Sequence, residues 1–369
     1  MQFIDLKRQY QEIEKEVNEG IQKVLNHGRY IMGPEIEELE AKLAEFCGRK
    51  HCLACSSGTD ALLIPLMAWE TGPGDAVFTT PFSFIATSEV IRLTGATPVF
   101  VDIDPATFNI DPAKLEQQII RIEKETDLNP KAVIPVDLFG QPADYDIITK
   151  IANEHNLLVL EDAAQSFGGE YHGKRTGKFG HAAATSFFPA KPLGAYGDGG
   201  AAFTDDDDMQ AKFKSIRVHG EGTDRSEHVR TGINGRIDSI QAAVLLAKLK
   251  LFPAELEMRQ KAADRYSENL REKVTVPFIA EGRKSAWAQY SVLAENSGQR
   301  DEIRSRLQKA EIPSAVYYQI PLHLEKAYAD LGYQRGDMPA AEDIAQRIFS
   351  LPMHPYLSEE DIDKICNII

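Results

Sequence analysis

One segment of the chain places a single amine in an unusual setting. Lys191 follows an apolar, aromatic run (residues 186–190) and precedes a loop (residues 192–201) that carries four glycines. Glycine lets the backbone come close to a bulky planar ligand, and a lysine among apolar groups loses part of its preference for the charged form. Such an amine can form a Schiff base with an aldehyde cofactor. A surface lysine in a turn is the alternative interpretation.

A carboxylate at the end of an apolar run is the second candidate. The sequence LLVL at residues 157–160 is followed by Glu161, Asp162 and, three residues later, Gln165. Sites in parallel sheets lie outside the carboxyl ends of the strands. A buried aspartate there needs a cationic partner to remain ionised, and a protonated pyridine nitrogen would be such a partner. A metal ligand or a turn residue would also fit this position.

Two further segments could bind anions. Residues 56–62, SSGTDAL, lead from an apolar run into a helical pattern, and free N–H groups at a helix N-terminus bind phosphate. A simple N-cap explains the same residues equally well. Residues 232–238, GINGRID, offer the amide of Asn234 and the guanidinium of Arg236, which can bind an anion in a bidentate manner. Arg236 could instead pair with an acid near the start of the next helix.

The elements that must position these residues alternate between strand and helix. Two helical patterns fill the first fifty residues. Short apolar runs then predict strands that are buried on both faces, at residues 76–80, 98–102, 132–137 and 157–161. Helical periodicity separates them, at residues 61–70, 85–94 and 144–155. This alternation predicts an α/β fold with a mainly parallel central sheet and helices on both faces.

The pattern changes after residue 198. One more strand is expected at residues 201–204, and a long helix at 238–269 that Pro253 interrupts. The remaining residues mix strand-like and helical runs, which predicts a smaller α+β domain; the runs are 287–293 and 314–318 for strands, and 301–310 and 340–349 for helices. We therefore expect a large domain over residues 1–250 and a small C-terminal domain over residues 251–369.

Composition narrows the class of protein. The 369 residues are 43% hydrophobic and 26% charged, as in ordinary globular proteins. The net charge of −15 argues against a nucleic-acid partner, and no apolar run reaches the roughly 20 residues of a membrane helix. Four cysteines are too few for a disulfide framework, which favours the cytoplasm. Cys52 and Cys55 form a C-x-x-C pair without a second ligand pair, so we expect buried small residues there and no metal site.

The order of four motifs resembles a known enzyme family. The motifs SSGTDAL, EDAAQSFG, SFFPAKPLGAYGDGGA and GINGRIDSIQAA are together similar to those of the sugar aminotransferases of the DegT/DnrJ/EryC1/StrS group. The similarity extends over nearly the whole chain, from residue 3 to residue 357. It implies pyridoxal 5′-phosphate (PLP) as cofactor and the fold type I aminotransferase architecture. It also implies a homodimer with active sites between the subunits.

The resemblance assigns a role to each candidate residue. Lys191 would be the Schiff-base lysine, Asp162 would pair with the pyridine nitrogen, and Gln165 would lie near the 3-hydroxyl of the ring. The remaining cofactor-binding residues would be Gly58, Thr59 and Ser186 at the phosphate, Phe84 stacked on the ring, and Asn234 reaching the phosphate from the neighbouring subunit. The implied reaction moves an amino group from L-glutamate to a ketosugar. A related group of dehydratases has histidine where this chain has lysine, so Lys191 favours amino transfer.

The spelling of several segments indicates the sugar. Residues 312–323, IPSAVYYQIPLH, and residues 350–357, SLPMHPYL, are most similar to aminotransferases for UDP-2-acetamido-2-deoxy-3-oxo-glucuronate, which serve lipopolysaccharide O-antigen synthesis. Arg236, Tyr317 and Tyr318 would contact the substrate. That subgroup has His-Tyr where this chain has Tyr317-Tyr318, and a phenol cannot become a cation near neutral pH. A dTDP-linked 3-keto-6-deoxyhexose therefore remains an alternative acceptor. A regulatory protein that binds PLP without catalysis is the alternative of a different class.

Overall fold

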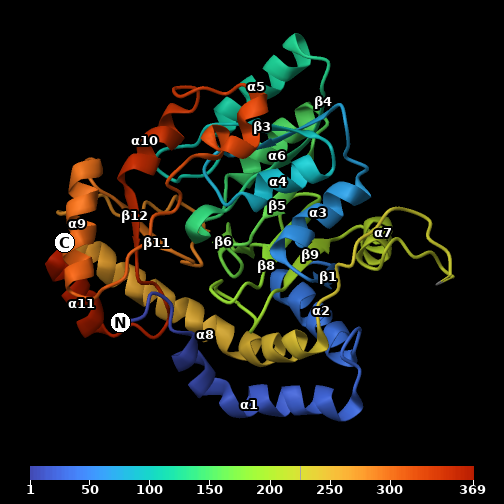
Figure 1. The fold of residues 1–369 in the computed structure, drawn as a ribbon, viewed down its shortest axis with the longest axis horizontal. Helices are drawn as coiled ribbons and strands as arrows, with labels where there is room; N and C mark the ends of the chain where they lie inside the picture. Colours follow the sequence, from blue (N-terminus) through green and yellow to red (C-terminus); the bar gives the residue numbers. More distant parts are fainter. Residues whose placement is uncertain (225) are drawn as a thin grey trace.

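A seven-stranded sheet forms the centre of the larger part of the molecule (Figure 1). The computed structural model describes residues 1–224 and 226–369. In sequence order, the strands of this sheet are β1 (His51–Cys55), β2 (Asp75–Thr79), β3 (Thr97–Phe100), β4 (Asn129–Ile134), β5 (Leu158–Asp162), β8 (Ala182–Ser186) and β9 (Gly200–Thr204). Their spatial order is β1-β9-β8-β5-β4-β2-β3. Only β9 runs antiparallel to its neighbours, so the predicted mainly parallel sheet is confirmed.

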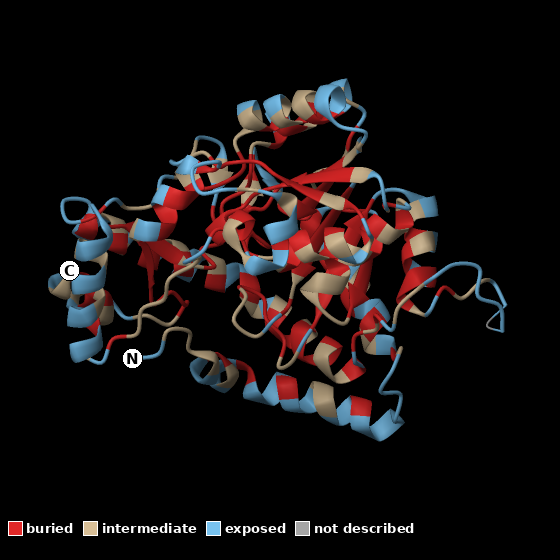
Figure 2. Cartoon of the chain, turned by 45° about the horizontal axis from the view of Figure 1, so that its top comes forward, coloured by how far each residue is buried: buried red, intermediate tan, exposed pale blue. Residues whose placement is uncertain are grey.

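Helices cover both faces of this sheet, because alternate strand residues point to opposite sides. Leu53 and Cys55 of β1 pack with one set of helices, whereas Cys52 and Ala54 pack with the other. The first set is α3 (Gly58–Ala68), α4 (Ala86–Leu93) and α7 (Asp207–Arg217). The second set is α2 (Pro34–Cys47), α5 (Pro112–Glu125), α6 (Tyr145–Glu154) and the first half of α8. Figure 2 shows the result, with buried strands between helices that are exposed on their outer sides. The α/β layers predicted from the sequence are confirmed.

The longest helix, α8 (Ser239–Leu270), runs through Pro253 without interruption. The expectation that Pro253 would interrupt this helix is wrong. Proline removes one backbone hydrogen bond and costs about 3 kcal/mol in a helix interior. Here α8 packs against α1 (Leu6–His27), α2 and α11 (Glu359–Ile368), and burial along its whole length outweighs that cost. The predicted division between residues 250 and 251 falls inside this helix and stays a prediction.

The C-terminal part has its own small core. Its strands β11 (Tyr290–Leu293) and β12 (Ile348–Leu351) pair antiparallel and pack with α9 (Ser297–Lys309), α11 and the end of α8. Helix α10 (Pro339–Arg347) joins a cluster that lies against the large sheet. The shorter elements are β6 (Glu170–Tyr171), β7 (Lys174–Arg175) and β10 (Arg283–Lys284), which form a three-stranded sheet, and the 3-10 turns at Leu138–Gly140, Leu322–Leu324 and Lys326–Leu331. Within the described residues, no helix combines the length and apolar character that crossing a membrane requires.

Two expectations for the C-terminal part need correction. The strand predicted at residues 314–318 is absent, and only Ala315 forms a bridge, with Ser350. Tyr318 instead turns toward the large sheet, where its ring packs edge-on to Phe82 at 6.0 Å and its hydroxyl accepts a hydrogen bond from Gln165. The helix predicted at residues 340–349 ends at Arg347, because residues 348 and 349 begin β12.

Asp102 ties α10 to the large sheet. This residue follows β3, is 4% exposed, and accepts hydrogen bonds from the N–H groups of Ala340 and Ala341 at 3.1 and 3.0 Å. The helix has no side-chain cap of its own at Met338. Asp102 therefore supplies the cap from a strand more than 230 residues earlier.

Candidate active site

The ends of three strands converge at one edge of the sheet. Asp162 ends β5 and Ser186 ends β8, its parallel neighbour. On the antiparallel strand β9, Gly200 lies opposite both Ser186 and Cys55, the last residue of β1. The loops after β1, β5 and β8 therefore meet at the carboxyl edge, where α/β folds bind ligands.

Gly58 permits a close approach between β8 and the start of α3. A Cβ atom at Gly58 would lie 2.5 Å from the Cβ of Ser186, so any other residue would push β8 away from the start of α3. The N-cap of α3 is Ser57, whose Oγ accepts from the Asp60 N–H at 3.1 Å. This cap leaves the N–H groups of Gly58 and Thr59 without partners inside the helix. A helix start with free N–H groups beside the Ser186 hydroxyl has the chemistry of a phosphate site.

Asp162 is a buried carboxylate held by neutral donors. It is 4% exposed, and its two oxygens accept from Thr87 Oγ1 at 2.7 Å and from the Ala164 N–H at 3.1 Å. Burial raises the pKa of Asp162, against the lowering effects of these hydrogen bonds and of Lys191. A cation placed at this carboxylate would offset the cost of its burial. Sequence reasoning missed Thr87, since its partner lies 75 residues away.

Lys191 faces the same site from the loop after β8. Its backbone N–H donates to the Phe188 carbonyl at 2.9 Å, which closes a tight turn. Burial lowers the pKa of Lys191, and Asp162 acts in the opposite direction. The structure thus brings the two predicted catalytic residues within electrostatic reach of each other.

Gln165 and Phe84 both contact the hydroxyl of Tyr318. The side chain of Gln165 is 3% exposed, accepts from the Phe139 N–H at 2.8 Å, and donates to the Tyr318 hydroxyl at 3.1 Å. These bonds fix the plane of its amide. Phe84 is 57% exposed, and its backbone contacts the hydroxyl of Tyr318. An exposed phenyl ring beside a polar site can cover a planar ligand.

Asn234 and Arg236 lie on the loop before α8. This loop is bound to the candidate phosphate site at the start of α3, because the Ser56 N–H donates to the Gly235 carbonyl at 3.0 Å. Asn234 is exposed, and Arg236 is partly buried with its Nε lacking a partner among the described groups. Both side chains thus remain available to a ligand or to a second subunit.

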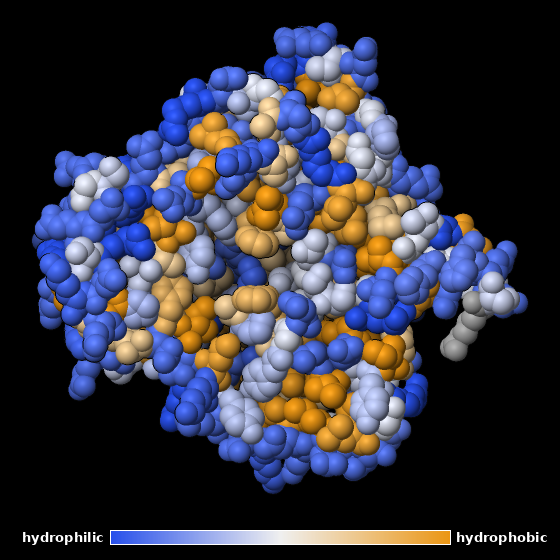
Figure 3. All heavy atoms as spheres, in the orientation of Figure 1, coloured by the Kyte–Doolittle hydropathy of each residue, from blue (hydrophilic) through white to orange (hydrophobic). Residues whose placement is uncertain are grey.

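Tyr317 lies in the segment that follows α9. Its ring lies 6.4 Å from that of Phe3 and 6.0 Å from that of Tyr318. Burial raises the pKa of Tyr317, so the phenol stays neutral at neutral pH. Figure 3 shows the molecule hollowed near the middle of one face, with apolar side chains gathered over the α1–α8 pair below.

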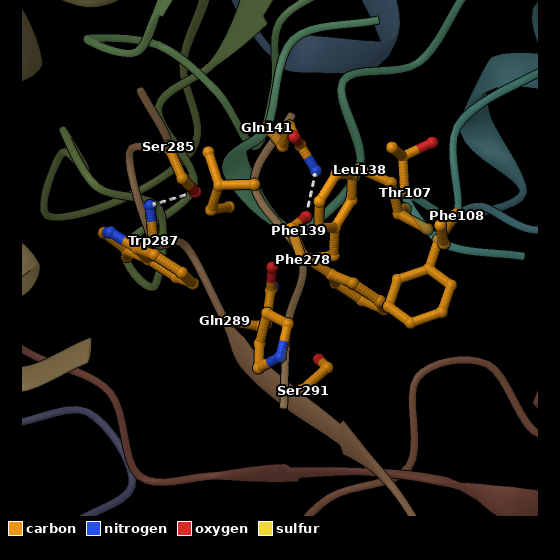
Figure 4. A pocket seen from close by; sticks show the side chains of 13 residues that line it. Thr107, Phe108, Leu138, Phe139, Gln141, Phe278, Ser285, Trp287, Gln289 and Ser291 are labelled. Carbon is orange, nitrogen blue, oxygen red and sulfur yellow. Dashed lines mark hydrogen bonds between the residues drawn. The ribbon is translucent and has the colours of Figure 1, made fainter. Parts of the chain in front are cut away.

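A separate cavity lies behind Phe139. It has a volume of only about 20 Å³, and Figure 4 shows Phe108, Phe139, Phe278 and Trp287 around it, together with polar groups such as Gln289. Its lining includes no predicted cofactor residue. The cavity therefore belongs to the junction between the large sheet and residues 277–291.

A family model describes the chain from residue 11 to residue 369. The chain belongs to the DegT/DnrJ/EryC1/StrS aminotransferase family. It is 47% identical to UDP-2-acetamido-2-deoxy-3-oxo-D-glucuronate aminotransferase from Pseudomonas aeruginosa, over 99% of this chain and 98% of that protein. The resemblance expected from the four motifs is confirmed.

Solved structures of DegT/DnrJ/EryC1/StrS proteins share the fold. A family aminotransferase from Brucella abortus has a TM-score of 0.97 and 51% identity, covering 100% of this chain and 98% of its own. The PLP form of a putative sugar aminotransferase from Streptococcus pneumoniae has a TM-score of 0.88 and 27% identity, covering 96% of this chain and 94% of its own. The chain is thus a PLP-dependent aminotransferase with the predicted fold type I architecture.

The residues of this chain fit PLP. The Gly58–Ser186 approach leaves a helix start open to a phosphate, and the buried carboxylate of Asp162 lacks only a cationic partner. Burial lowers the pKa of the Lys191 amine, which favours the form that can bond an aldehyde carbon. The individual residue roles remain predictions.

Proposed function

We propose that this aminotransferase moves the amino group of L-glutamate to the 3-keto carbon of a nucleotide-linked sugar, UDP-2-acetamido-2-deoxy-3-oxo-glucuronate, for bacterial polysaccharide synthesis. The placement of Asp162 at the end of β5 and of Lys191 in the loop after β8, the neighbouring strand, carries the proposal for the chemistry. The 47% identity to the Pseudomonas aeruginosa enzyme supports the choice of sugar.

Each residue has a defined task in this proposal. PLP, when bound, supplies a pyridinium ring that accepts the electrons released at the α-carbon of the donor. Asp162 keeps the proton on the ring nitrogen by pairing with it. The free amine of Lys191 takes the proton from the α-carbon and delivers it to C4′ of the cofactor. Phe84 covers one face of the ring, and Gln165 orients it.

The second half of the reaction runs in the opposite direction on the sugar. Lys191 returns a proton to the carbon that was the ketone, and Arg236 holds an anionic group of the substrate. Tyr317 favours a second candidate acceptor, a dTDP-linked 3-keto-6-deoxyhexose. A neutral phenol can donate a hydrogen bond to either sugar, but it cannot form the ion pair with a uronate that a protonated histidine would form.

The proposed assembly is a homodimer with shared sites. Tyr30 and Ile31 are about half exposed although apolar, at 48% and 49%. They lie against the start of α8, since the Ser239 N–H donates to the Tyr30 carbonyl at 2.8 Å and Ile31 bridges to Asp238. This apolar segment adjoins the loop of Asn234, which supports a second subunit covering both. A cytoplasmic location, suggested by four buried and unpaired cysteines, is part of the same proposal.

Substitution of Lys191 tests the proposed function. Lys191→Ala removes the amine that is proposed to bond the aldehyde carbon, so we expect the visible absorption band of lysine-linked PLP to disappear. Conversion of PLP to its amine form by L-glutamate should fall at least a thousandfold, within the range that a nucleophile and proton carrier contributes. Lys174→Ala, at an exposed lysine, should behave like wild type.

The same assay separates the alternatives. Wild-type protein that holds PLP unchanged in the presence of glutamate would be a binding protein, which contradicts the proposal. Comparison of the 3-ketouronate and the 3-keto-6-deoxy sugar as acceptors decides between the two substrates.

A further inference from the structure

A second lysine lies beneath the loop that carries Lys191. Lys248 of α8 is 1% exposed, which is unusual for a lysine. Its Nζ donates a short hydrogen bond to the carbonyl of Gly194 and lies 4.9 Å from the ring centroid of Tyr196. The ammonium thus contacts the Gly194 carbonyl and the Tyr196 ring, which follow Lys191 by three and five residues.

The loop has little freedom apart from this contact. The Ala195 N–H donates to the Phe187 carbonyl at 2.7 Å, and a Cβ on Gly194 would lie 2.7 Å from the Phe188 carbonyl. The tight turn therefore directs the Gly194 carbonyl outward to α8. Gln241, two turns earlier on α8, accepts from the Tyr196 N–H at 2.9 Å and donates to its carbonyl at 3.3 Å.

The surroundings of Lys248 disfavour its charged form. Burial and Arg259 lower the pKa of Lys248, and Glu255 only partly opposes them, so its value is about 8. Glu255 is itself occupied by Gln9 and Tyr356. Burying a charged amine destabilises the folded protein unless the amine is paired. The hydrogen bond from Lys248 to the Gly194 carbonyl provides such a pairing.

We propose that Lys248 is a positioning residue for Lys191, and that its bond to the Gly194 carbonyl holds the turn in the shape that presents the Lys191 amine to the cofactor. The inference rests on the proposed role of Lys191. Lys248 acts through the loop, because the group that its Nζ contacts is the backbone carbonyl of Gly194.

Lys248→Met tests this proposal, since it keeps an unbranched side chain of similar size but removes the donor. Without the donor the loop relaxes until the Gly194 carbonyl finds water, and PLP binding must restore it. We expect PLP to bind about tenfold more weakly, the size expected when a buried carbonyl loses its partner. Hydrogen exchange at the amides of residues 187–197 should be faster, even in the protein without PLP.

Two variants serve as controls. Lys248→Gln retains an N–H donor without the charge and should stay within about threefold of wild type in PLP affinity, since a neutral donor still pairs the carbonyl. Lys250→Met, at an exposed lysine of the same helix, should change neither measurement. If Lys248→Met does not fold, Lys248→Ala replaces it, because it also removes the tie between α8 and the loop without placing a long apolar side chain against the carbonyl.

The outcomes are distinct. Unchanged PLP affinity and exchange in the Met or Ala variant would overturn the proposal, as would equal losses in the Gln and Met variants. A wild-type protein that forms no lysine-linked PLP would remove the proposed function and this inference together. Normal linkage in wild type with no effect at position 248 would remove only the inference.

Discussion

At the scale of single residues, the site depends on a carboxylate that receives only neutral hydrogen bonds. Thr87 and the Ala164 N–H hold the two oxygens of Asp162. Both bonds lower the pKa of Asp162, while burial raises it. The hydroxyl of Thr87 therefore helps to keep Asp162 ionised before any cation arrives.

Thr87→Val should weaken catalysis without unfolding the protein. Loss of the hydroxyl raises the pKa of Asp162 further and weakens its pairing with the ring nitrogen. We expect kcat for the glutamate half-reaction to fall about tenfold to a hundredfold, because hydrogen bonds to charged groups contribute ~1.5–3 kcal/mol.

The controls for this prediction use two other threonine variants. Thr87→Ser keeps the hydroxyl and should recover most of the rate. Thr79→Val removes another buried threonine hydroxyl, which donates to Ile134 on the neighbouring strand, and should lower stability without changing the rate. Equal rates for the Val and Ser variants at position 87 would contradict the assigned role.

At the scale of elements, one carboxylate joins two parts of the fold. Asp102 accepts from two N–H groups of α10 and from the Nζ of Lys114 at 2.9 Å. Although burial opposes it, these bonds lower the pKa of Asp102 below its ordinary value. Residues 322–345 reach the large sheet next to this contact.

Asp102→Ala should lower the free energy of unfolding by on the order of 2 kcal/mol, because it leaves buried N–H groups of α10 unpaired. A lowered pKa in the folded state means that this stabilisation is complete above the ordinary pKa of about 3.9 and is lost as the pH falls further. The difference between variant and wild type should therefore be full at pH 7 and shrink below pH 4. Urea unfolding of variant and wild type at pH 7 and at a pH below 4 measures this difference.

Asp111→Ala is the matched control for this prediction. The Asp111 side chain caps α5 at the surface by accepting from the N–H groups of Ala113 and Lys114. Its loss should therefore lower the free energy of unfolding by about 1 kcal/mol. A loss at Asp102 no larger than that at Asp111 would contradict the tie between α10 and the sheet.

At the scale of the whole molecule, an apolar surface remains to be covered. Ile31 is 49% exposed beside the loop of Asn234, and Ile147 of α6 is 48% exposed on another element. The two residues match in type and exposure, but only Ile31 belongs to the proposed subunit interface.

Ile31→Asp should convert the protein from dimer to monomer, because a charge in an apolar interface loses its hydration without gaining a partner. PLP affinity should fall with it, since Asn234 of the neighbouring subunit is proposed to hold the phosphate. Light scattering after size exclusion measures the mass. Ile147→Asp should leave mass and affinity unchanged, and a dimeric Ile31→Asp variant would place the interface elsewhere.

The sequence predicted the sheet well, because its strands are apolar runs buried on both faces and its helices alternate with them. β9 was expected as a strand, but its antiparallel direction depends on the return of residues 187–199 and has no local signal. Residues 112–125, which form α5, did not stand out. The course of residues 314–318 depends on Phe82 and Gln165, both remote in sequence.

The site was predictable where a motif is continuous along the chain. Lys191, Asp162 and Gly58 lie in such motifs, and the structure places them at one edge of the sheet. Thr87 and Lys248 act on this site from other elements. Their side chains are ordinary for a helix, and only the folded chain brings them to their partners.

The continuous course of α8 through Pro253 has a mechanical consequence. One rod passes from the core of the large sheet into the core of the C-terminal part. The helix bends most easily at Pro253, because Pro253 has no N–H to donate to the carbonyl of Leu249. The C-terminal part, which includes Tyr317, would therefore rotate about the turn between Leu249 and Pro253, directly after Lys248.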